Sequence, residues 1–419
     1  MGRVVITGLG AVTPLGNDVA SSWEAMKAGR SGIGLITTFD TTSYPVKIGG
    51  MCDQFEVDGR LPDSHINRYL HRGERFGVAA SAEALADAGL EPGVYEPDEL
   101  GVSMGASVDR PTLQELSDVL SARRHSDGHR LERFPPSRAL QISQTTGCAR
   151  VAQLAGASGP MISVSTACTA SLHAIGEAYR RIQDGDVKAM VAGGYDALTS
   201  WLDVLGFALL GALTTEYNDD PEHASRPFDR DRSGFVIGEG ATVFVLEDLE
   251  SAEARGAEPV AEVLGYAASL NAYRMTDPPP DGGGAVLAMR GALREAHIDP
   301  TEVDYVVAHG TGTPSGDVSE TIGIKRAFDG HAHELVVTSP KSMVGHTTCA
   351  AGALNVLAGV LAMRDGIVSP TINLDTPDPE CDLDYVPNQA REMPVRTVVT
   401  NGFAFGGTNG ALCLRRFDG

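Results

Sequence analysis

The sequence is short of positive charge and of long apolar runs, and each shortage excludes a class of protein. Its 419 residues include 33 lysines and arginines against 55 aspartates and glutamates, a formal net charge of −22. General binding to nucleic acid or to an anionic membrane surface is therefore not expected. No apolar run reaches the roughly 18 residues of a membrane span. The start, MGRVVITGLG, reads as a strand and not as a secretion signal. We expect a cytoplasmic protein.

Paired cysteines are also absent. The six cysteines are scattered along the chain without a CxxC pair, at Cys52, Cys148, Cys168, Cys349, Cys381 and Cys413. This spacing argues against a disulfide framework and against a zinc site. We therefore expect reduced thiols and no metal.

Strand-like and helix-like segments alternate along the chain, with glycine-rich turns between them. This pattern predicts an α/β protein with mostly parallel sheets. The order of elements before about residue 255 is repeated after it, which predicts two similar halves, residues 1–255 and 256–419. Within the first half, residues 233–250 read as two strands interrupted by glycines.

The stretch SVSTACTASLHAIGEAYRRI, residues 163–182, reads as a short strand, a tight turn of small residues and an amphipathic helix. Cys168 then lies in the first turn of that helix, where free N–H groups and the macrodipole favour an anion. A lowered thiol pKa is expected there, as a nucleophile requires. A free cysteine is more often simply buried, and this stretch alone leaves both roles open.

Three loops in the second half follow buried strands and carry polar residues. They are HGTGTPSGD with His309, SPKSMVGH with Lys341 and His346, and GFAFGGTNG with Phe403 and Phe405. In open α/β sheets, sites form at the carboxyl ends of the strands. One histidine alone is more often structural, but two at strand ends beside glycines suit acyl-thioester chemistry with Cys168.

At this point a family resemblance becomes specific. The motifs VSTACTAS, RPFDRDRSGFVIGEG, MTDPPPDGGG, AHGTGTP, KSMVGH, TINLDTPD and FGGTNG resemble, in order, those of the elongating β-ketoacyl-[acyl-carrier-protein] synthases of the thiolase superfamily. The resemblance covers essentially the whole chain. It implies a five-layer α-β-α-β-α sandwich built from two similar halves. It also implies a decarboxylating Claisen condensation between a cysteine-bound acyl chain and malonyl carrier.

The resemblance implies a role for each matching residue. Cys168 matches the nucleophile, and His309 and His346 match the pair that promotes decarboxylation and stabilises the enolate. Lys341 matches the lysine that organises the site electrostatically, with Glu320 as its expected partner. The amides of Cys168 and Phe405 match the oxyanion hole, and Phe405 also matches the gate to the cysteine.

The substrate pocket is implied in the same way. Residues that match its walls are Thr276, Thr311, Thr313, Phe403 and Val108. No metal or redox cofactor is implied, because the substrates ride on the phosphopantetheine arm of acyl carrier protein.

Three departures from the family pattern are visible. Ser107–Arg110, SVDR, replaces a glycine-rich turn near the end of the acyl pocket, so chain-length preference does not carry over. Leu210 and Gly211 stand where many relatives have an arginine for carrier docking, which suggests a different docking surface or partner. Ala404 replaces a glycine between the two phenylalanines, and its Cβ is expected to restrict the gate loop.

Several alternatives remain at this stage. The chain is similar to fatty acid enzymes that act as homodimers. It is also similar to ketosynthase chains of dissociated polyketide systems, which act as heterodimers with a chain-length factor. Cys168 argues against the non-catalytic chain-length factor itself. The absence of a cysteine from GFAFGGTNG argues against a biosynthetic thiolase. A carrier-binding module without chemistry is the remaining alternative.

Overall fold

The computed structural model describes residues 2–55, 60–125 and 137–419. Within them, ten strands form one sheet in the order β10-β9-β13-β14-β8-β1-β7-β6-β4-β5. The strands of the first half are β1 (Val4–Val12), β4 (Leu100–Gly105), β5 (Met161–Val164), β6 (Ala189–Asp196) and β7 (Gly240–Asp248). Those of the second half are β8 (Ala261–Leu270), β9 (Tyr305–Val307), β10 (Val336–Thr338), β13 (Thr397–Phe403) and β14 (Thr408–Arg416).

The two sets of five strands repeat one pattern in opposite order. In each set the two outer pairings are parallel and the two inner pairings are antiparallel. The sets meet where β1 pairs with β8 over three residues, Val4–Ile6 with 261–263. The predicted duplication is therefore present, but the expectation of mostly parallel sheets is wrong. In each half the last strand, β7 or β14, runs antiparallel to both of its neighbours in the sheet.

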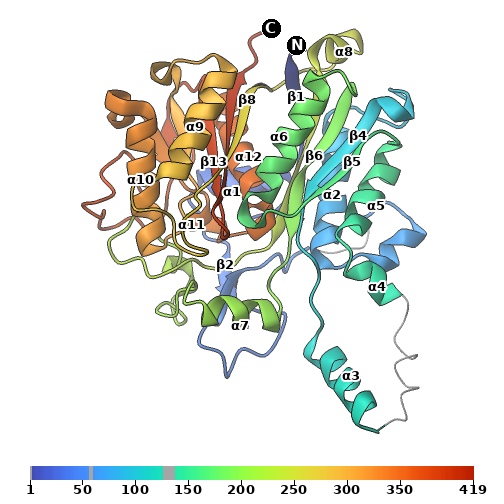
Figure 1. Ribbon diagram of the computed structural model, residues 1–419, viewed down its shortest axis with the longest axis vertical. Helices are drawn as coiled ribbons and strands as arrows, with labels where there is room; N and C mark the ends of the chain where they lie inside the picture. Colours follow the sequence, from blue (N-terminus) through green and yellow to red (C-terminus); the bar gives the residue numbers. More distant parts are fainter. Residues whose placement is uncertain (1, 56–59, 126–136) are drawn as a thin grey trace.

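The helices form three layers around the strands (Figure 1). In the middle lie α6 (Ala170–Gln183) and α12 (Ala351–Asp365), which share one buried apolar cluster with strands of both halves. The outer layers are α2 (Arg72–Asp87) with α5 (Thr145–Ala155) on one side and α9 (Gly283–Ala296) with α10 (Pro314–Phe328) on the other. This is the five-layer thiolase-like sandwich that the resemblance implied.

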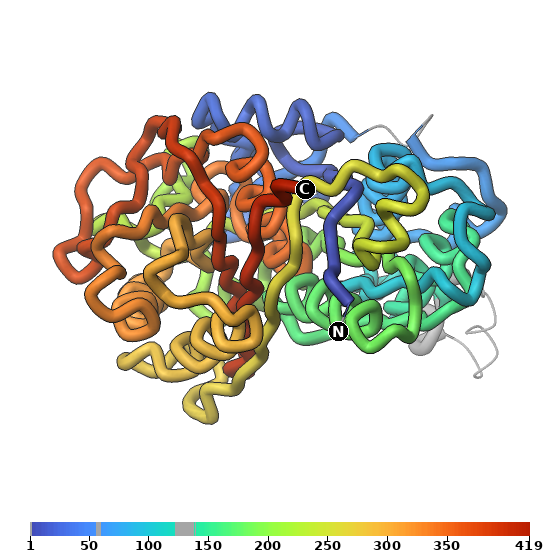
Figure 2. The backbone as a smooth tube through the Cα atoms, turned by 90° about the horizontal axis from the view of Figure 1, so that it is seen from above, coloured from blue at the N-terminus to red at the C-terminus, as the bar shows by residue number. Residues whose placement is uncertain are grey.

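The remaining elements lie outside this order of layers, although several of them are buried. The short helices are α1 (Val19–Lys27), α3 (Leu113–His125), α4 (Ser137–Gln141), α7 (Trp201–Leu209), α8 (Leu249–Ala254) and α11 (Lys341–Val344). Two small sheets pair β2 (Ile33–Leu35) with β3 (Ile48–Gly50) and β11 (Ile367–Val368) with β12 (Arg391–Glu392). Seen from above, the two halves lie side by side, and both ends of the described chain come close to their junction (Figure 2).

Residues 233–250 correct one prediction. Only β7 is a strand there, whereas the segment before it makes isolated bridges, among them Ile237 with His346. Gly234 has a φ of +137° that side chains rarely adopt, so the backbone turns and does not continue a ladder. The segment that was expected to be a strand instead holds the backbone of His346, a candidate site residue, through Val236 and Gly238.

The helix α12 is apolar on every side, and its residues 351–363 are all buried. Its one polar core residue, Asn355, donates to the carbonyl oxygens of Ala308 and Asn401, both at 2.9 Å. These carbonyls lie at the end of β9 and on β13, so Asn355 fixes two of the site loops at their origins. In the part of the chain that the structure describes, no helix is both long and apolar enough to cross a bilayer.

Candidate active site

One cavity of about 290 Å³ collects the predicted residues of both halves. Cys168 lies in its wall with His309, His346, Phe403 and Phe405. Of the six cysteines, all in described residues, Cys168 is half-buried and the other five are buried. The sulfur with access to a cavity is therefore the one that the sequence singled out.

A left-handed turn presents Cys168. The strand β5 ends at Val164, Ala167 takes a φ of +51°, and a single 3-10 turn, residues 167–169, leads into α6. A non-glycine residue at positive φ stores strain, which is a feature of functional turns. The predicted strand–turn–helix unit is confirmed, although its strand begins before residue 163, at Met161.

The expected fall in the pKa of Cys168 is not found. Burial raises the pKa of the thiol to about 12, although the Lys341 ammonium and the backbone amides of Cys168 and Phe405 act to lower it. Asp196 acts with burial to raise it. Enclosure of the sulfur thus outweighs the helix start. The amides of Cys168 and Phe405 both act on the pKa of this thiol, so both lie close to the sulfur.

The rings of the two histidines lie edge to face in the cavity wall. Their ring centroids are 5.3 Å apart, and the planes are nearly perpendicular at 83°. Burial, with the charge of Lys341 added, lowers the pKa of both rings well below the usual value, so both are neutral. Neutral imidazoles can donate one hydrogen bond each without bringing a positive charge into the cavity.

The hydrogen position on His346 follows from its contacts. The amide of Thr348 donates to Nδ1 at 3.3 Å, so Nδ1 accepts and Nε2 carries the hydrogen. The segment before β7 holds the backbone of His346. The N–H of His346 donates to the carbonyl oxygen of Val236 at 2.7 Å, and its carbonyl oxygen accepts from the N–H of Gly238 at 2.9 Å. The ring is therefore a fixed donor.

His309 is held by Glu320. The two carboxylate oxygens accept the N–H groups of His309 and Gly310 at 2.8 and 2.7 Å, and Asn401 donates a third hydrogen bond at 3.1 Å. The expected partnership of Glu320 with Lys341 is electrostatic only. Glu320 raises the pKa of Lys341, but burial acts more strongly and lowers it to about 8. Within the described residues, the Lys341 ammonium has no hydrogen-bond partner.

The predicted pocket residues separate into two groups. Thr276, Thr311, Thr313 and Phe403 line the cavity, whereas Val108 does not and lies half-buried beyond β4. The turn of Val108 is polar, because the Ser107 hydroxyl donates to Asp196 and Arg138 pairs with Asp109.

The residue that shapes the loop after β9 was not predicted. Asp317, fully buried at the start of α10, accepts the N–H groups of Thr311 and Gly312, each at 3.1 Å, and of Phe228 at 2.8 Å. Its only visible signal was an acidic residue inside the apolar-flanked motif HGTGTPSGD. It makes the threonine wall of the cavity rigid.

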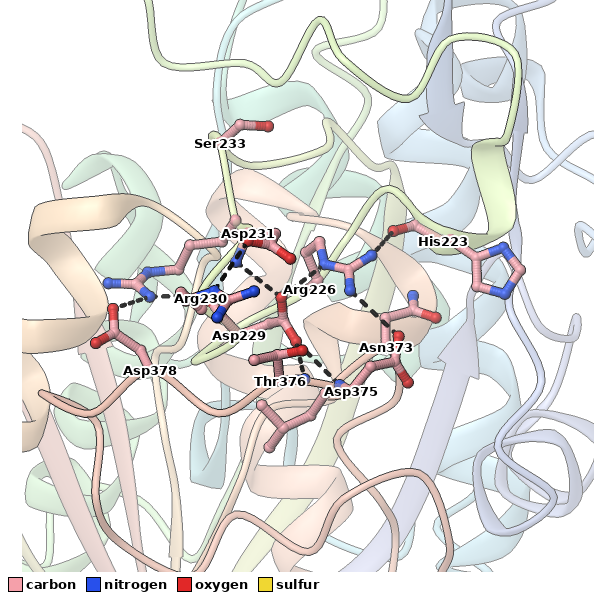
Figure 3. Close-up of polar contacts among 12 residues, drawn as sticks. His223, Arg226, Asp229, Arg230, Asp231, Ser233, Asn373, Asp375, Thr376 and Asp378 are labelled. Atoms are coloured by element: carbon pink, nitrogen blue, oxygen red, sulfur yellow. Dashed lines mark hydrogen bonds and ion pairs between the residues drawn. The ribbon is translucent and has the colours of Figure 1, made fainter.

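The motif RPFDRDRSGF forms an ionic network with the TINLDTPD motif (Figure 3). Arg226 bonds Asp229 at 3.0 Å and Asp375 at 3.2 Å, and Asp229 also accepts the amides of Asp375 and Thr376. Arg232 reaches Asp378 at 2.6 Å. Ser233 and Gly234, which follow Arg232 directly in the chain, line the cavity. Within residues 2–55, 60–125 and 137–419, no three His, Cys, Asp or Glu side chains group as a metal site.

Comparisons of the chain with known proteins agree with this site geometry. Residues 1–252 match the model of the beta-ketoacyl synthase N-terminal domain, and residues 260–375 match that of the C-terminal domain. The chain is 44% identical to the 3-oxoacyl-[acyl-carrier-protein] synthase 2 of Coxiella burnetii, over 99% of both chains. It is 42% identical to the actinorhodin polyketide putative beta-ketoacyl synthase 1 of Streptomyces coelicolor, over 99% of this chain and 88% of the other.

Two solved structures extend this likeness. One is a type II polyketide synthase acyl carrier protein in complex with its ketosynthase, at 32% identity and a TM-score of 0.87 over 100% of both chains. The other is the ishigamide ketosynthase/chain length factor, at 33% identity and a TM-score of 0.88 over 99% of both chains. Homologous ketosynthases are therefore known in complexes with a carrier protein and with a chain-length factor.

Proposed function

The chain belongs to the beta-ketoacyl synthase family and is an acyltransferase of the β-ketoacyl-[acyl-carrier-protein] synthase type, and we propose that Cys168, His309 and His346 carry its chemistry. The observation that carries the assignment is the single cavity in which the half-buried thiol meets two neutral, fixed imidazoles. A decarboxylating condensation needs one nucleophile and hydrogen-bond donors for two successive oxyanions.

The first step is acyl transfer. The sulfur of Cys168 attacks the thioester carbonyl of an acyl carrier, and the oxyanion that forms takes hydrogen bonds from the amides of Cys168 and Phe405. The bond to the carrier sulfur breaks, and the proton of the Cys168 thiol ends on the released carrier thiol. The Lys341 charge favours the thiolate during this exchange.

The second step forms the carbon–carbon bond. The malonyl unit loses carbon dioxide, and His309 and the Nε2–H of His346 donate to the enolate oxygen. The enolate carbon attacks the acyl carbonyl on Cys168, and the departing thiolate takes up a proton. Because carbon dioxide leaves in place, no strong base is needed, and neutral histidines suit the role better than carboxylates would.

Single variants test this division. Cys168→Ala is expected to abolish acyl transfer while malonyl carrier still loses carbon dioxide at a measurable rate. His309→Ala and His346→Ala are expected to block decarboxylation while Cys168 still becomes acylated, as intact-protein mass spectrometry would report. Equal loss of both steps in the histidine variants would refute the division, and acylation at a residue other than Cys168 would refute the nucleophile.

The proposed partner at the cavity mouth is acyl carrier protein, held mainly by apolar contacts. Leu209, Leu210 and Met275 are 79%, 58% and 76% exposed, and the last two line the mouth. The Arg274 charge beside them is paired with Asp277 at 3.4 Å. Leu209→Glu should raise KM for the carrier. If the affinity of the unaltered protein for the carrier fell steeply with added salt, apolar docking would be contradicted.

The arginines at and just before the start of α2 contribute little to carrier docking. Arg72 pairs with Glu239, and Arg75 donates to the carbonyl oxygen of Leu70. Arg68 is exposed and stacks over Tyr69 at 4.7 Å. Of these three arginines, only Arg68 is therefore proposed to meet an acidic partner.

We further propose that a second chain of the same fold packs on the N-terminal half. The edge strand β5 is exposed at Met161, by 46%. The helix α3, which stands away from the body (Figure 1), exposes Leu113, Leu116 and Leu120 at spacings typical of one helix face. Both features suit a symmetric dimer. Leu120→Glu should give monomers in light scattering, whereas Leu287→Glu, at a 63% exposed position on α9, should not.

The remaining proposals concern context. We place the protein in the cytoplasm and divide it into residues 1–255 and 256–419, in line with the repeated strand order. The chain is almost equally identical to a 3-oxoacyl-[acyl-carrier-protein] synthase and to a polyketide beta-ketoacyl synthase, so both pathways stay open. Of the two, we propose fatty acid elongation by a homodimer first. A chain that condenses acyl and malonyl carriers only after a chain-length factor is added would favour the polyketide heterodimer.

A further inference from the structure

The turn that carries Cys168 is bound directly to the loop that carries Phe405, although 237 residues separate them in the sequence. The hydroxyl of Thr169 donates to the carbonyl oxygen of Thr166 at 2.7 Å. It also lies 2.8 Å from the hydroxyl of Thr408. Thr169 donates its one hydrogen to Thr166, so it can only accept from Thr408, whose hydroxyl also lies 3.4 Å from the same Thr166 carbonyl oxygen. Thr408, the first residue of β14, is thus joined to the turn through its side chain.

A second bridge runs through His173 on α6. Its Nε2 lies 3.3 Å from the carbonyl oxygen of Asn409, and its Nδ1 lies 3.0 Å from the hydroxyl of Thr166. A carbonyl only accepts, so Nε2 carries the hydrogen, and Nδ1 accepts from Thr166. Burial lowers the pKa of His173, which keeps the ring in this neutral form.

Both bridges end where the Phe405 loop ends. The loop is closed on itself by the amide of Ala404 bonded to the carbonyl of Thr408 at 2.9 Å. Next along β14, a Cβ at Gly410 would approach Leu172 to 2.6 Å and His173 to 2.9 Å. At Gly410, α6 and β14 therefore pack too closely to leave room for a side chain on the strand.

We propose that His173 and Thr408 are positioning residues which align the two amides of the oxyanion hole, since one amide comes from each half of the molecule. This inference rests on the proposed function. Neither side chain contacts the reacting atoms. Each fixes the distance between the Cys168 turn and the Phe405 loop, so that both N–H groups point at one place.

Thr408→Val and His173→Leu remove one bridge each with little change in volume. Acyl transfer to Cys168 passes through an oxyanion, whereas alkylation of the same sulfur by iodoacetamide does not. Each variant is expected to slow acyl transfer about 10-fold, less than the loss of an oxyanion donor outright costs. The loss should appear in kcat, with KM and the alkylation rate unchanged. Thr408→Ser should restore the rate.

Thr400→Val is the matched control. Thr400 is a buried threonine on β13 whose hydroxyl has no hydrogen-bond partner among the described residues, so its loss should leave every rate as it is. Equal slowing of alkylation and acyl transfer would overturn the proposal, because the bridges would then hold the sulfur and not the oxyanion hole. Unchanged acyl transfer in both variants would overturn it as well. An unaltered protein that never acylates Cys168 would instead refute the proposed function.

Discussion

Each half contains one copy of the same turn, and in both copies a cysteine follows a residue in the left-handed conformation. In the first half Ala167, with a φ of +51°, precedes Cys168 at the start of α6. In the second half Thr348, with a φ of +46°, precedes Cys349 at the start of α12. Both cysteines open a helix of the central layer after an edge strand of their own half, so the backbone alone does not decide which sulfur reacts.

The surroundings decide it. The turn of Cys349 is held by a carboxylate from the other half, because Asp196 accepts the hydroxyl of Thr348 and the amide of Cys349, the latter at 3.0 Å. Burial and this charge raise the pKa of Cys349 well above its usual value. The turn of Cys168 is held by hydroxyls and a neutral histidine, and Lys341 opposes the effect of burial. The same turn thus holds one thiol at the cavity, where the Lys341 charge opposes the effect of burial, and one enclosed thiol whose turn is bonded to the Asp196 carboxylate.

The strongest test of this contrast removes each sulfur in turn. Cys168→Ala should lower condensation by a factor of about 10³ or more, because the nucleophile is gone. Cys349→Ala should change it by no more than about threefold, since a small buried side chain is shortened. Product formation from defined acyl and malonyl carriers, followed by mass spectrometry, measures both. Comparable losses would mean that the two turns do not differ as described.

Lys341→Met tests the charge that favours the Cys168 thiolate. Lys341 lowers the pKa of Cys168, so its removal should raise that pKa and slow alkylation by iodoacetamide about 10-fold at neutral pH, roughly one pKa unit. In the unaltered protein the pKa of Lys341 is about 8, so its charge is present below pH 8 and is lost above it. The pH profile of alkylation measures the shift, and a profile that moves to lower pH would contradict the assignment.

Asp196→Asn tests the opposite charge. Asp196 raises the pKa of Cys168, so the variant should lower that pKa and speed alkylation several-fold at neutral pH. It should also destabilise the fold by about 2 kcal/mol, because an amide cannot accept all the hydrogen bonds that the buried carboxylate takes. Denaturant unfolding and alkylation kinetics on the same sample separate the two effects. Slower alkylation would remove Asp196 from the explanation.

The smallest expected difference concerns the left-handed residues themselves. Ala167→Gly relieves the positive φ at the cost of a more flexible unfolded chain, so the free energy of unfolding should stay within about 0.5 kcal/mol. Thr348→Gly also loses the hydrogen bond to Asp196 and should cost about 1 to 2 kcal/mol. If Ala167→Gly were the more damaging change, the two turns would not be held in the way described here.

The sequence predicted the features that depend on local signals. The strand–turn–helix unit of Cys168 and the loops of His309 and His346 follow from strand ends, glycines and apolar runs. Asp196 and Asn355 escaped prediction, because each acts on residues more than 40 positions away and lies in no recognised motif. Thr408 lies in the FGGTNG motif, but its partner Thr169 is far from it in the sequence.

Two predictions failed for the same physical reason. The pKa of Cys168 was judged from the helix start, a local effect, but the enclosure of the sulfur by both halves dominates. The two strands expected in 233–250 were judged from apolar residues, but the first segment is used to hold His346 from across the molecule. Tertiary surroundings override local preference at the site, where the two halves meet.

The central layer has a consequence for how the protein melts. α6 and α12 bury their side chains in a single apolar cluster that also takes in strands from both sides of the molecule. Neither half therefore has a complete apolar core of its own. One half cannot unfold without exposing apolar surface of the other half to water. Calorimetry should record a single cooperative transition for the chain, and either half expressed alone should remain insoluble or require its counterpart to fold.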